Sequence, residues 1–440
     1  MQIKGLFFIL LLLLFPFAVC AQEIYDLKRC LELGLERNYE IRIVRNEQQI
    51  ADNNTTIGNA GFLPALDLSA GYSGTVNNVN QYLTDGSKNE KNSVHNRIAN
   101  AGINLNWTAF DGFLIQAKYD RLKELQRMGE LNIRLLIEDF TAGFSAEYYN
   151  YIRQKIRLGN LSYAVELSKE RLRIIGARYN IGSMSRLDYQ QARVDFNADS
   201  SNLIKQYEVV YTSRVRLNQL MALDDVSQNL VLRDSLIEFN PLLDETEMWN
   251  KMLSSNSSLL LSAKEKRISE LDYKAIKSRD YPYLKVNAGY GYTQNIYEMG
   301  MYDKQQTIGF NYGLTLGFNI FDGFNRKREQ KNARLQIQNK ELRYEQLELG
   351  LKADLSNIWM AYHNNMELTN LEKENLQTAK INYSIAIERY KLGDLSGIEL
   401  REAQNSLFEA EERLLRAQYN TKLCEISLLQ ISGQIMNYLE

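Results

Sequence analysis

The side chains in this sequence that could do chemistry are mainly carboxylates. Glu399 and Glu402 lie three residues apart in sequence that is predicted to be helical, so both fall on one face of that helix. Carboxylates gathered in this way repel one another, so a cluster of such pairs is costly unless cations or water screen the charges. An exposed glutamate pair is also common on any solvated helix, and that simpler interpretation stays open.

Catalysis has little support in the sequence. The two histidines, His95 and His363, have no cysteine or second histidine near them at a spacing typical of a metal site. No glycine-rich phosphate loop, GxSxG or HExxH motif occurs. We therefore expect a protein that is not an enzyme and that uses no cofactor or metal.

The elements that position the carboxylates belong to a long internal repeat. The tetrapeptide Phe-Asp-Gly-Phe occurs at 110–113 and again at 321–324, 211 residues later. The same offset relates three further residues of one copy to three of the other: Arg178, Tyr179 and Gly182 to Arg389, Tyr390 and Gly393. A constant offset over such a distance indicates a tandem duplication. We expect repeat one to cover residues 22–232 and repeat two to cover residues 233–440.

The offset is larger before the tetrapeptides. Pro64 and Pro282 are 218 residues apart, so repeat one carries seven additional residues between its proline and its Phe-Asp-Gly-Phe. Length variation of this kind belongs in an exposed loop.

The N-terminal sequence indicates export, and the composition disfavours nucleic acid as a partner. Residues 1–21 have the features of a signal peptide: Lys4, an apolar run and then small residues. Acylation of Cys20 is a weaker alternative, because bulky residues flank the small residue two positions before it. The net charge of −2 provides no basic surface for nucleic acid. We interpret Cys30 and Cys424 as buried thiols rather than as a disulfide.

Long proline-free stretches with apolar residues at three- and four-residue spacing predict helices. The two longest expected helices, Phe113–Tyr179 and Phe324–Tyr390, would each be ~100 Å long at about 1.5 Å per residue. Shorter helices are expected at 187–221, 398–432, 27–57 and 245–277. Apolar spacing near 3.5 residues would make these helices pack as coiled coils.

Two segments have the alternation of β-hairpins, at about 66–110 and about 284–320. In 308–320, apolar and aromatic side chains alternate with small or polar ones over more than the ~9–11 residues that a transmembrane strand needs. No apolar stretch after residue 21 approaches the ~18–20 residues of a membrane helix. A soluble sheet also alternates, but it would carry charged residues on its polar face, and these are nearly absent here.

Four strands cannot close a barrel, and open sheet edges in lipid would leave backbone groups unpaired. Two chains would supply eight strands, enough only for a filled interior, whereas three would supply twelve and leave room for a lumen. The sequence therefore predicts a homotrimer. The fold class that we expect is mainly α-helical with a membrane β-barrel portion, in which each protomer supplies four strands and long coiled-coil helices.

A signal peptide is followed by two copies of one ordered set: helix, proline, hairpin, Phe-Asp-Gly, very long helix, Arg-Tyr-x-x-Gly and return helix. This order resembles the TolC family of outer-membrane efflux channels. This resemblance covers essentially the whole chain after residue 21. It implies a trimeric twelve-stranded barrel in outer-membrane lipid, continued by a helical tunnel across the periplasm. It also implies a periplasmic adaptor (membrane fusion) protein and an inner-membrane transporter as partners, in an efflux or type I secretion system.

The resemblance also assigns roles to residues near the predicted turns. It places adaptor contacts at the turn residues Arg178, Tyr179, Gly182, Arg389 and Gly393. It places an acidic entrance at Glu399 and Glu402, and a closed-gate network at Asp188 and Tyr390. The arginine that completes the gate network in the family is replaced by Leu395, so a gate in this chain would be held differently, with Arg186 or Arg389 as possible substitutes. The glycines have a simpler role too, because a tight turn between helices needs positive φ.

A different class of protein also fits part of the pattern. A secreted periplasmic coiled-coil scaffold or adaptor without a pore would also have long helices, with its strands in a soluble domain. Helix dominates this chain, however, and the strands form two long isolated hairpins, which favours the channel. The substrate and the energy source of the pump cannot be inferred from the sequence.

Overall fold

The computed structural model describes residues 24–439. The predicted signal peptide at 1–21 and Cys20 lie outside the described residues. The chain forms two compact units. Unit 1 comprises the described residues up to Ile43, Arg134–Ser257 and Glu348 onward, and unit 2 comprises Val44–Ile133 and Ser258–Leu347. Both repeats contribute to both units, so the repeat bounds at 22–232 and 233–440 remain a prediction about sequence.

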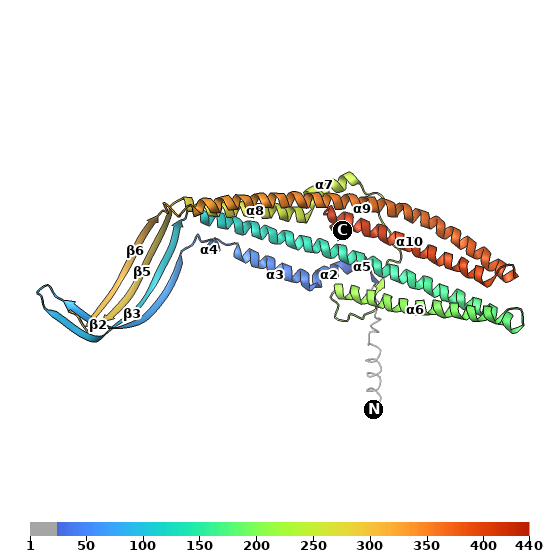
Figure 1. Cartoon of the computed structure of the whole chain (residues 1–440), viewed down its shortest axis with the longest axis horizontal. Helices are drawn as coiled ribbons and strands as arrows, with labels where there is room; N and C mark the ends of the chain where they lie inside the picture. The colour runs from blue at the N-terminus through green and yellow to red at the C-terminus, as the bar shows by residue number, and fades with distance from the viewer. Residues whose placement is uncertain (1–23, 440) are drawn as a thin grey trace, which may run out of the picture. The chain divides into compact units, whose positions relative to one another are not determined.

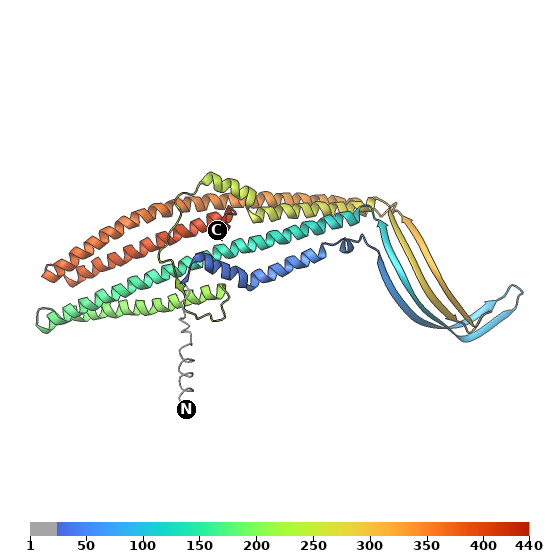
Figure 2. The same cartoon turned by 180° about the vertical axis from the view of Figure 1, so that it is seen from behind.

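Unit 2 contains a four-stranded antiparallel sheet (Figures 1 and 2). Its strands are β2 (Ala65–Tyr82), β3 (Lys88–Phe110), β5 (Tyr283–Ile296) and β6 (Lys304–Gly317). They lie in the order β2-β3-β5-β6, so β3 of repeat one pairs with β5 of repeat two. β2 and β6 are left as the two edges.

The second hairpin is shorter than the alternation predicts. We expected it to extend to Ile320, but β6 ends at Gly317, which pairs with Tyr283, the first residue of β5. The residue before Tyr283 is Pro282, which has no N–H to donate to a neighbouring strand. Phe318–Ile320 therefore continue the alternating pattern without a partner strand.

The apolar residues of the alternating pattern lie on an uncovered face of the sheet. Tyr312 is 83% exposed and Leu68 is 81% exposed, and the remaining large apolar side chains on β6, from Ile308 to Leu316, are exposed as well. A soluble protein seldom leaves so large an apolar area in water. The exposed face indicates a sheet whose natural surroundings are not aqueous.

Besides the sheet, unit 2 contains α4 (Ile57–Ala60), all but the first residue of α8 (Ser257–Lys277), and the 3₁₀ helix η1 (Ser278–Asp280). The part of α3 (Tyr39–Asn54) from Val44 onward and the first parts of α5 (Leu114–Asn180) and α9 (Asn325–Leu392) also belong to this unit. Each long helix begins directly after a Phe-Asp-Gly-Phe tetrapeptide. The two long helices therefore start from equivalent sites, as the repeat predicts.

The two tetrapeptides have the same conformation. Gly112 and Gly323 have φ of 72° and 69°, and in each tetrapeptide the two phenylalanine rings meet edge to face with centroids 5.2 and 5.3 Å apart. The aspartate caps the following helix: Asp111 accepts from the N–H of Ile115 at 3.1 Å, and Asp322 from that of Arg326 at 2.9 Å. Phe-Asp-Gly-Phe is thus a structural turn from strand to helix.

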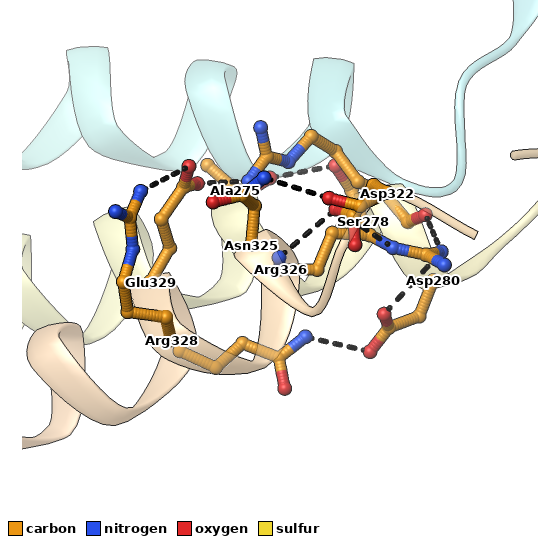
Figure 3. A network of polar contacts seen from close by, with 10 residues as sticks. Ala275, Ser278, Asp280, Asp322, Asn325, Arg326, Arg328 and Glu329 are labelled. Atoms are coloured by element: carbon orange, nitrogen blue, oxygen red, sulfur yellow. Dashed lines mark hydrogen bonds and ion pairs between the residues drawn. The ribbon is translucent and has the colours of Figure 1, made fainter.

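The surroundings of the two turns differ. Ile115 is buried and lies against the helix-terminal Gly61. Its equivalent in repeat two is Arg326, which forms ion pairs with Asp322 at 3.3 Å and Asp280 at 3.8 Å and donates to the carbonyl of Arg279 at 2.9 Å (Figure 3). One junction is held by apolar packing and the other by charge.

Unit 1 contains two helical hairpins with their turns at the same end (Figure 1). α5 is followed by α6 (Arg186–Leu220), and α9 by α10 (Gly397–Ile431). At the other end of these hairpins, apolar cores form around Tyr148 and Leu217 in repeat one and around Tyr362 and Leu428 in repeat two. The remaining elements of unit 1 are short: β1 (Ile24–Tyr25), α2 (Leu27–Arg37), β4 (Val231–Leu232), α7 (Glu245–Ser255) and η2 (Ile435–Leu439).

The helices that precede the hairpins are broken, which the periodicity does not predict. The single helix expected at 27–57 is divided into α2, α3 and α4, and the one expected at 245–277 into α7 and α8. The first break is at Asn38, whose side chain accepts from the N–H of Glu40 at 2.9 Å and so caps the new helix. The second break is at Asn256, which occupies the equivalent position 218 residues later.

Two further findings concern membrane helices and cysteines. No helix within residues 24–439 has both the length and the apolar character needed to cross a membrane. Cys30 is buried and Cys424 is half-buried, and both are free thiols.

Candidate functional site

The residues assigned to function by sequence gather at the two hairpin turns of unit 1, which we call tip one (Arg178–Asp188) and tip two (Arg389–Glu399). Gly182 has φ of 81° and Gly393 has φ of 92°, as a tight helix-to-helix turn requires. A Cβ atom at either glycine would meet no atom within 4 Å. Backbone conformation rather than crowding therefore accounts for both glycines.

Asp188 and Glu399 complete capping boxes at the starts of the return helices. At tip one, the Asp188 carboxylate accepts from the Ser185 hydroxyl at 2.7 Å, and the Ser185 Oγ accepts from the Asp188 N–H at 3.1 Å. At tip two, Glu399 accepts from the hydroxyl and the N–H of Ser396 at 2.7 and 2.9 Å. These bonds hold the pKa of Glu399 below its ordinary value. The Ser-x-x-Asp/Glu spacing is the sequence signal that we missed.

Glu399 and Glu402 both line a shallow hollow of about 290 Å³ on tip two, together with Arg389. Glu402 is exposed and does not belong to the capping box, so its carboxylate is available for other interactions. Because Glu399 is held by Ser396, Glu402 is the cleaner candidate for an acidic entrance.

Arg178 and Tyr390 join the two tips. The Arg178 guanidinium lies over the Tyr390 ring, 5.3 Å from its centroid, and donates to the carbonyl oxygens of Lys391 at 3.0 Å and Tyr390 at 3.4 Å. Tyr390 is fully buried, which raises its pKa, and its hydroxyl has no hydrogen-bond partner among the described residues. Arg178 is therefore engaged within the chain, and the geometry gives no hydrogen bond between Tyr390 and Asp188.

The other predicted contact residues remain at the surface. Tyr179 is half-exposed and stacks on Tyr189 with centroids 5.4 Å apart. Arg389 is exposed and donates to the carbonyl of Asp394, in its own turn, at 3.4 Å. Leu395 packs against the apolar cluster around Tyr390. Tyr179 and Arg389 can thus reach another molecule, whereas Tyr390 cannot.

Sequence reasoning missed a buried ionic network behind tip one. Arg171 is only 4% exposed and pairs with Asp195 at 2.5 Å. Arg401 of repeat two forms two hydrogen bonds to Asp199 of repeat one, at 2.6 and 2.8 Å. Burial lowers the pKa of Arg171 and Asp195 opposes that shift, while the bonds to Asp199 raise the pKa of Arg401.

This network lies at a hollow of about 680 Å³ between α6 and α10. The charged residues of the hollow include Arg171, Arg401, Asp195 and Glu402, and Met184, Leu187 and Ile398 make part of its wall apolar. No group of three or more His, Cys, Asp or Glu in the described part of the chain could hold a metal ion. The hollow is a mixed apolar and ionic groove.

Four apolar residues at the tips were also missed, and they are 75 to 79% exposed: Ile181, Leu187, Leu392 and Ile398. They form two pairs at the offset of 211 residues, Ile181 with Leu392 and Leu187 with Ile398. Exposed apolar side chains at equivalent positions of both tips indicate a contact surface.

A sheet with an exposed apolar face, in a chain that also has paired long helices joined by tight turns, is typical of a membrane channel. Solved structures with this fold include the CmeC outer membrane channel of Campylobacter jejuni and a membrane protein from Pseudomonas aeruginosa. For CmeC the TM-score is 0.79 at 16% identity, covering 93% of this chain and 85% of that one. For the Pseudomonas protein it is 0.78 at 16% identity, covering 92% of each chain. The MtrE channel of Neisseria gonorrhoeae gives 0.73 at 16% identity, over 92% of this chain and 88% of that one.

The chain belongs to the outer membrane efflux protein family, whose model matches residues 30–223 and 249–434. The resemblance to TolC-like channels is therefore confirmed. The protein is an efflux channel component of the outer membrane that extends into the periplasm. A comparison with curated proteins finds no match.

Proposed function

We propose that three copies of this chain close a twelve-stranded barrel and form the outer-membrane channel of a tripartite efflux or type I secretion system. The observation that carries this proposal is the open sheet: β2 and β6 are unpaired edges, and one face is apolar and exposed. Unpaired edges in lipid cost several kcal/mol for each backbone group, so an open sheet is not stable in a membrane. Pairing β6 of one copy with β2 of the next would keep the strands antiparallel and remove every edge.

Exposed apolar residues at regular intervals in two segments of the chain support assembly from several copies. α9 has Leu335, Leu342 and Leu349 at seven-residue intervals, and the segment before β2 has Ile43, Ile50 and Ile57 at the same interval. A seven-residue apolar interval is typical of coiled-coil seams. The first series follows the edge strand β6 and the second precedes the edge strand β2, so closing the sheet would bring the two series together.

The tips supply the contacts expected for the other components. A periplasmic adaptor would bind the exposed apolar quartet, Ile181, Leu187, Leu392 and Ile398, with Tyr179 and Arg389 beside it. Arg178, Gly182 and Gly393 would support this surface by fixing its shape. An inner-membrane transporter would deliver the substrate to the adaptor, and the chain would move it outward without chemistry of its own.

An acidic entrance would follow from threefold symmetry. Three copies of Glu402, with three of Glu399 beside them, would gather six carboxylates at the tip end and favour cations. The equivalents in repeat one, Asp188 and Gln191, carry fewer charges, so repeat two would dominate the entrance. If the entrance has a closed state, Asp188 and Tyr390 cannot hold it as a hydrogen-bonded pair without rearrangement.

One experiment tests the assembly and the entrance together. The protein is purified from outer membranes in detergent, its mass is measured by light scattering, and its conductance is recorded in planar bilayers. We expect a trimer with cation-selective conductance, and we expect Glu402→Gln to reduce the selectivity. The control is Glu409→Gln, one heptad further along α10, where an exposed charge is removed away from the tip. A water-soluble monomer without conductance would instead support a periplasmic scaffold.

The adaptor surface is tested separately. Replacing Ile181 and Leu392 by serine should abolish efflux in cells while leaving the mass and conductance of the purified channel unchanged. Unchanged efflux in this variant would show that these residues do not contribute to docking.

A further inference from the structure

A small cavity lies inside unit 1, between α5 of repeat one and α9 and α10 of repeat two. Its volume is about 30 Å³. Arg171 of α5 and Tyr390 of α9 line it, and the aliphatic part of the wall consists of Leu167, Ile174, Ile387 and Leu400. Because roughly 10 to 15 Å³ already holds one water molecule, this cavity has room for one small ion but not for a phosphate or a carboxylic acid.

The two polar groups in this cavity are donors that lack acceptors. Arg171 is buried and uses Nη2 to pair with Asp195, but its Nε and Nη1 atoms have no hydrogen-bond partner within residues 24–439. The hydroxyl of the fully buried Tyr390 has none there either. A buried donor without an acceptor costs free energy, so such groups are rarely left unsatisfied. The arginine and the tyrosine therefore indicate a bound acceptor.

The charges around the cavity favour an acceptor that is negative. Glu170 is the acidic residue in the lining, and its carboxylate already accepts from the Arg173 guanidinium at 2.7 and 2.8 Å. The Arg178 guanidinium lies over the Tyr390 ring, 5.3 Å from its centroid, and adds a positive charge nearby. Arg171 supplies the opposite charge that a buried anion needs.

The hydrogen-bonding chemistry of the wall also favours an anion over a water molecule. A water molecule donates two hydrogen bonds as well as accepting them, and the aliphatic side chains of this wall accept none. A halide ion only accepts, so N–H and O–H donors directed at one point satisfy it completely. Hydrogen bonds in which one partner is charged are also stronger than neutral ones.

The duplication does not provide a second cavity of this chemistry. At the offset of 211 residues, Asn382 corresponds to Arg171, and Tyr179 corresponds to Tyr390. Asn382 carries no charge, and Tyr179 is half-exposed and stacks on Tyr189. The chain therefore combines a buried arginine with a buried tyrosine at one of the two equivalent places.

We propose that one chloride-sized anion binds in this cavity, held by the Nε–H and Nη1–H groups of Arg171 and by the hydroxyl of Tyr390. The ion joins α5 of repeat one to α9 of repeat two near the ends of both helices, and so fixes the two hairpins of unit 1 to each other. This role goes beyond the transport function. It depends on contacts within one chain and not on the proposed trimer.

The test is a chloride titration of the full-length protein, purified in detergent with sodium gluconate as the only salt. Gluconate is too large for the cavity. Sodium chloride then replaces gluconate at constant ionic strength, and hydrogen exchange is measured by mass spectrometry. We expect protection of α5 around Arg171 and of α9 around Tyr390 to rise with chloride and to saturate, and bromide to act in the same way. Protection of α8, which lies almost entirely in unit 2, should not change.

Variants locate the ion. Tyr390→Phe removes the hydroxyl and keeps the ring under Arg178, so the half-saturating chloride concentration should rise about tenfold or more, as expected when a hydrogen bond to a charged group is lost. Tyr179→Phe, at the equivalent position of repeat one, is the matched control and should not alter the titration. Arg171→Leu combined with Asp195→Ala removes the guanidinium without leaving a carboxylate unpaired, and should abolish the response to chloride.

Two results would overturn the anion site. Equal protection in chloride and in gluconate would show that no anion of this size binds and that water serves the buried donors. A saturable response that Tyr390→Phe retains unchanged would place the ion elsewhere in the molecule. Neither result bears on the channel, which is tested by the mass and conductance of the purified protein.

Discussion

Tip one and tip two have the same backbone but different surroundings. Both begin their return helix with a serine capping box, and both turn through a glycine with positive φ. Behind tip one lies the ionic network of Arg171, Asp195, Asp199 and Arg401. The residues at the corresponding positions are uncharged: Asn382, Ser406, Ala410 and Gln190.

The difference shows which properties a duplicated chain must keep and which it can change. Residues that fix backbone direction recur, because a turn in the wrong place would separate the helices. Residues that fill the space between helices have diverged, because each space has its own neighbours. The hollow of about 680 Å³ beside Arg171 is therefore ionic, whereas the hollow of about 290 Å³ at the Glu399 side of tip two has no such pairs. If the chains associate as we propose, two chemically distinct grooves alternate around the tip end.

The same contrast appears at the strand-to-helix junctions, with the roles of the repeats reversed. Repeat one places the buried Ile115 beside Gly61, while repeat two places Arg326 between Asp322 and Asp280 (Figure 3). The Phe-Asp-Gly-Phe turn tolerates both, because its own bonds determine its conformation.

The largest effect is expected from breaking the ionic network at tip one. Asp195→Ala leaves Arg171, which is 4% exposed, without its carboxylate partner. Losing one partner of a buried pair costs about 3 to 5 kcal/mol, so the protection of the α5 and α6 ends in hydrogen exchange should fall strongly. Ser406→Ala at the corresponding position of tip two should have little effect. Adding Arg171→Leu to Asp195→Ala should restore much of the protection, because no buried charge is then left unpaired. Equal losses of protection in Asp195→Ala and Ser406→Ala would contradict the difference between the two tips.

The next largest loss of stability is expected at the strand-to-helix junction of repeat one, which is held by apolar packing. Ile115→Ala removes a buried side chain beside Gly61 and should cost about 2 to 4 kcal/mol of local stability in unit 2. Arg326→Ala removes ion pairs whose acidic partners are partly exposed, so we expect a smaller loss. Hydrogen exchange in the first turns of α5 and α9 measures the two effects in the same sample. A larger loss for Arg326→Ala would show that charge, not apolar packing, dominates.

Alanine substitution at the two tetrapeptide glycines, Gly112 and Gly323, should lower the free energy of unfolding by different amounts. The difference should be about 1 to 3 kcal/mol, the usual cost of overpacking. Both have positive φ, so alanine is strained at either position, but only at Gly112 would the new Cβ collide with a backbone oxygen, that of Ser278. Gly112→Ala should therefore lower the stability of a monomeric form more than Gly323→Ala does. Chemical denaturation of detergent-dissociated chains provides the comparison.

Local signals predicted most of the fold. The long helix expected at Phe113–Tyr179 is α5 (Leu114–Asn180), and the one expected at Phe324–Tyr390 is α9 (Asn325–Leu392). These helices are predictable because both of their signals, the three- and four-residue apolar spacing and the Phe-Asp-Gly at the start, depend on residues that are close together in the sequence. The breaks at Asn38 and Asn256 were missed, since an asparagine inside a periodic stretch does not reveal whether its side chain caps a new helix.

The candidate site was less predictable than the fold. The turns, glycines and carboxylates could be placed from the repeat, but their partners could not. Arg401 bonds to Asp199 from 202 residues away, and only the packing of α6 against α10 brings these side chains together. Tyr390 is likewise packed among residues of both repeats, with the Arg178 guanidinium of repeat one over its ring. Sequence position indicated the right region, whereas the choice between exposed and buried residues needed three-dimensional contacts.

The smallest effect is expected at the caps. Ser396→Ala and Ser185→Ala should each lower the stability of their tip by about 1 kcal/mol, because both serines cap a return helix in the same way. The cap at tip two should also depend on pH. The pKa of Glu399 in the folded chain lies below its ordinary value of 4.5, so its contribution is present above that pH and is lost as the pH falls through the lower folded value.

Hydrogen exchange corrected for intrinsic rates should therefore show constant protection of the first turn of α10 from neutral pH down to 4.5, then a decline. Glu399→Gln retains an acceptor oxygen at this position but cannot titrate, so its protection should not change over the same acid range. A decline of equal size in Glu399→Gln would show that another group causes the acid sensitivity. The outcome also bears on the entrance, because a Glu399 committed to its cap leaves Glu402 as the carboxylate that cations would meet.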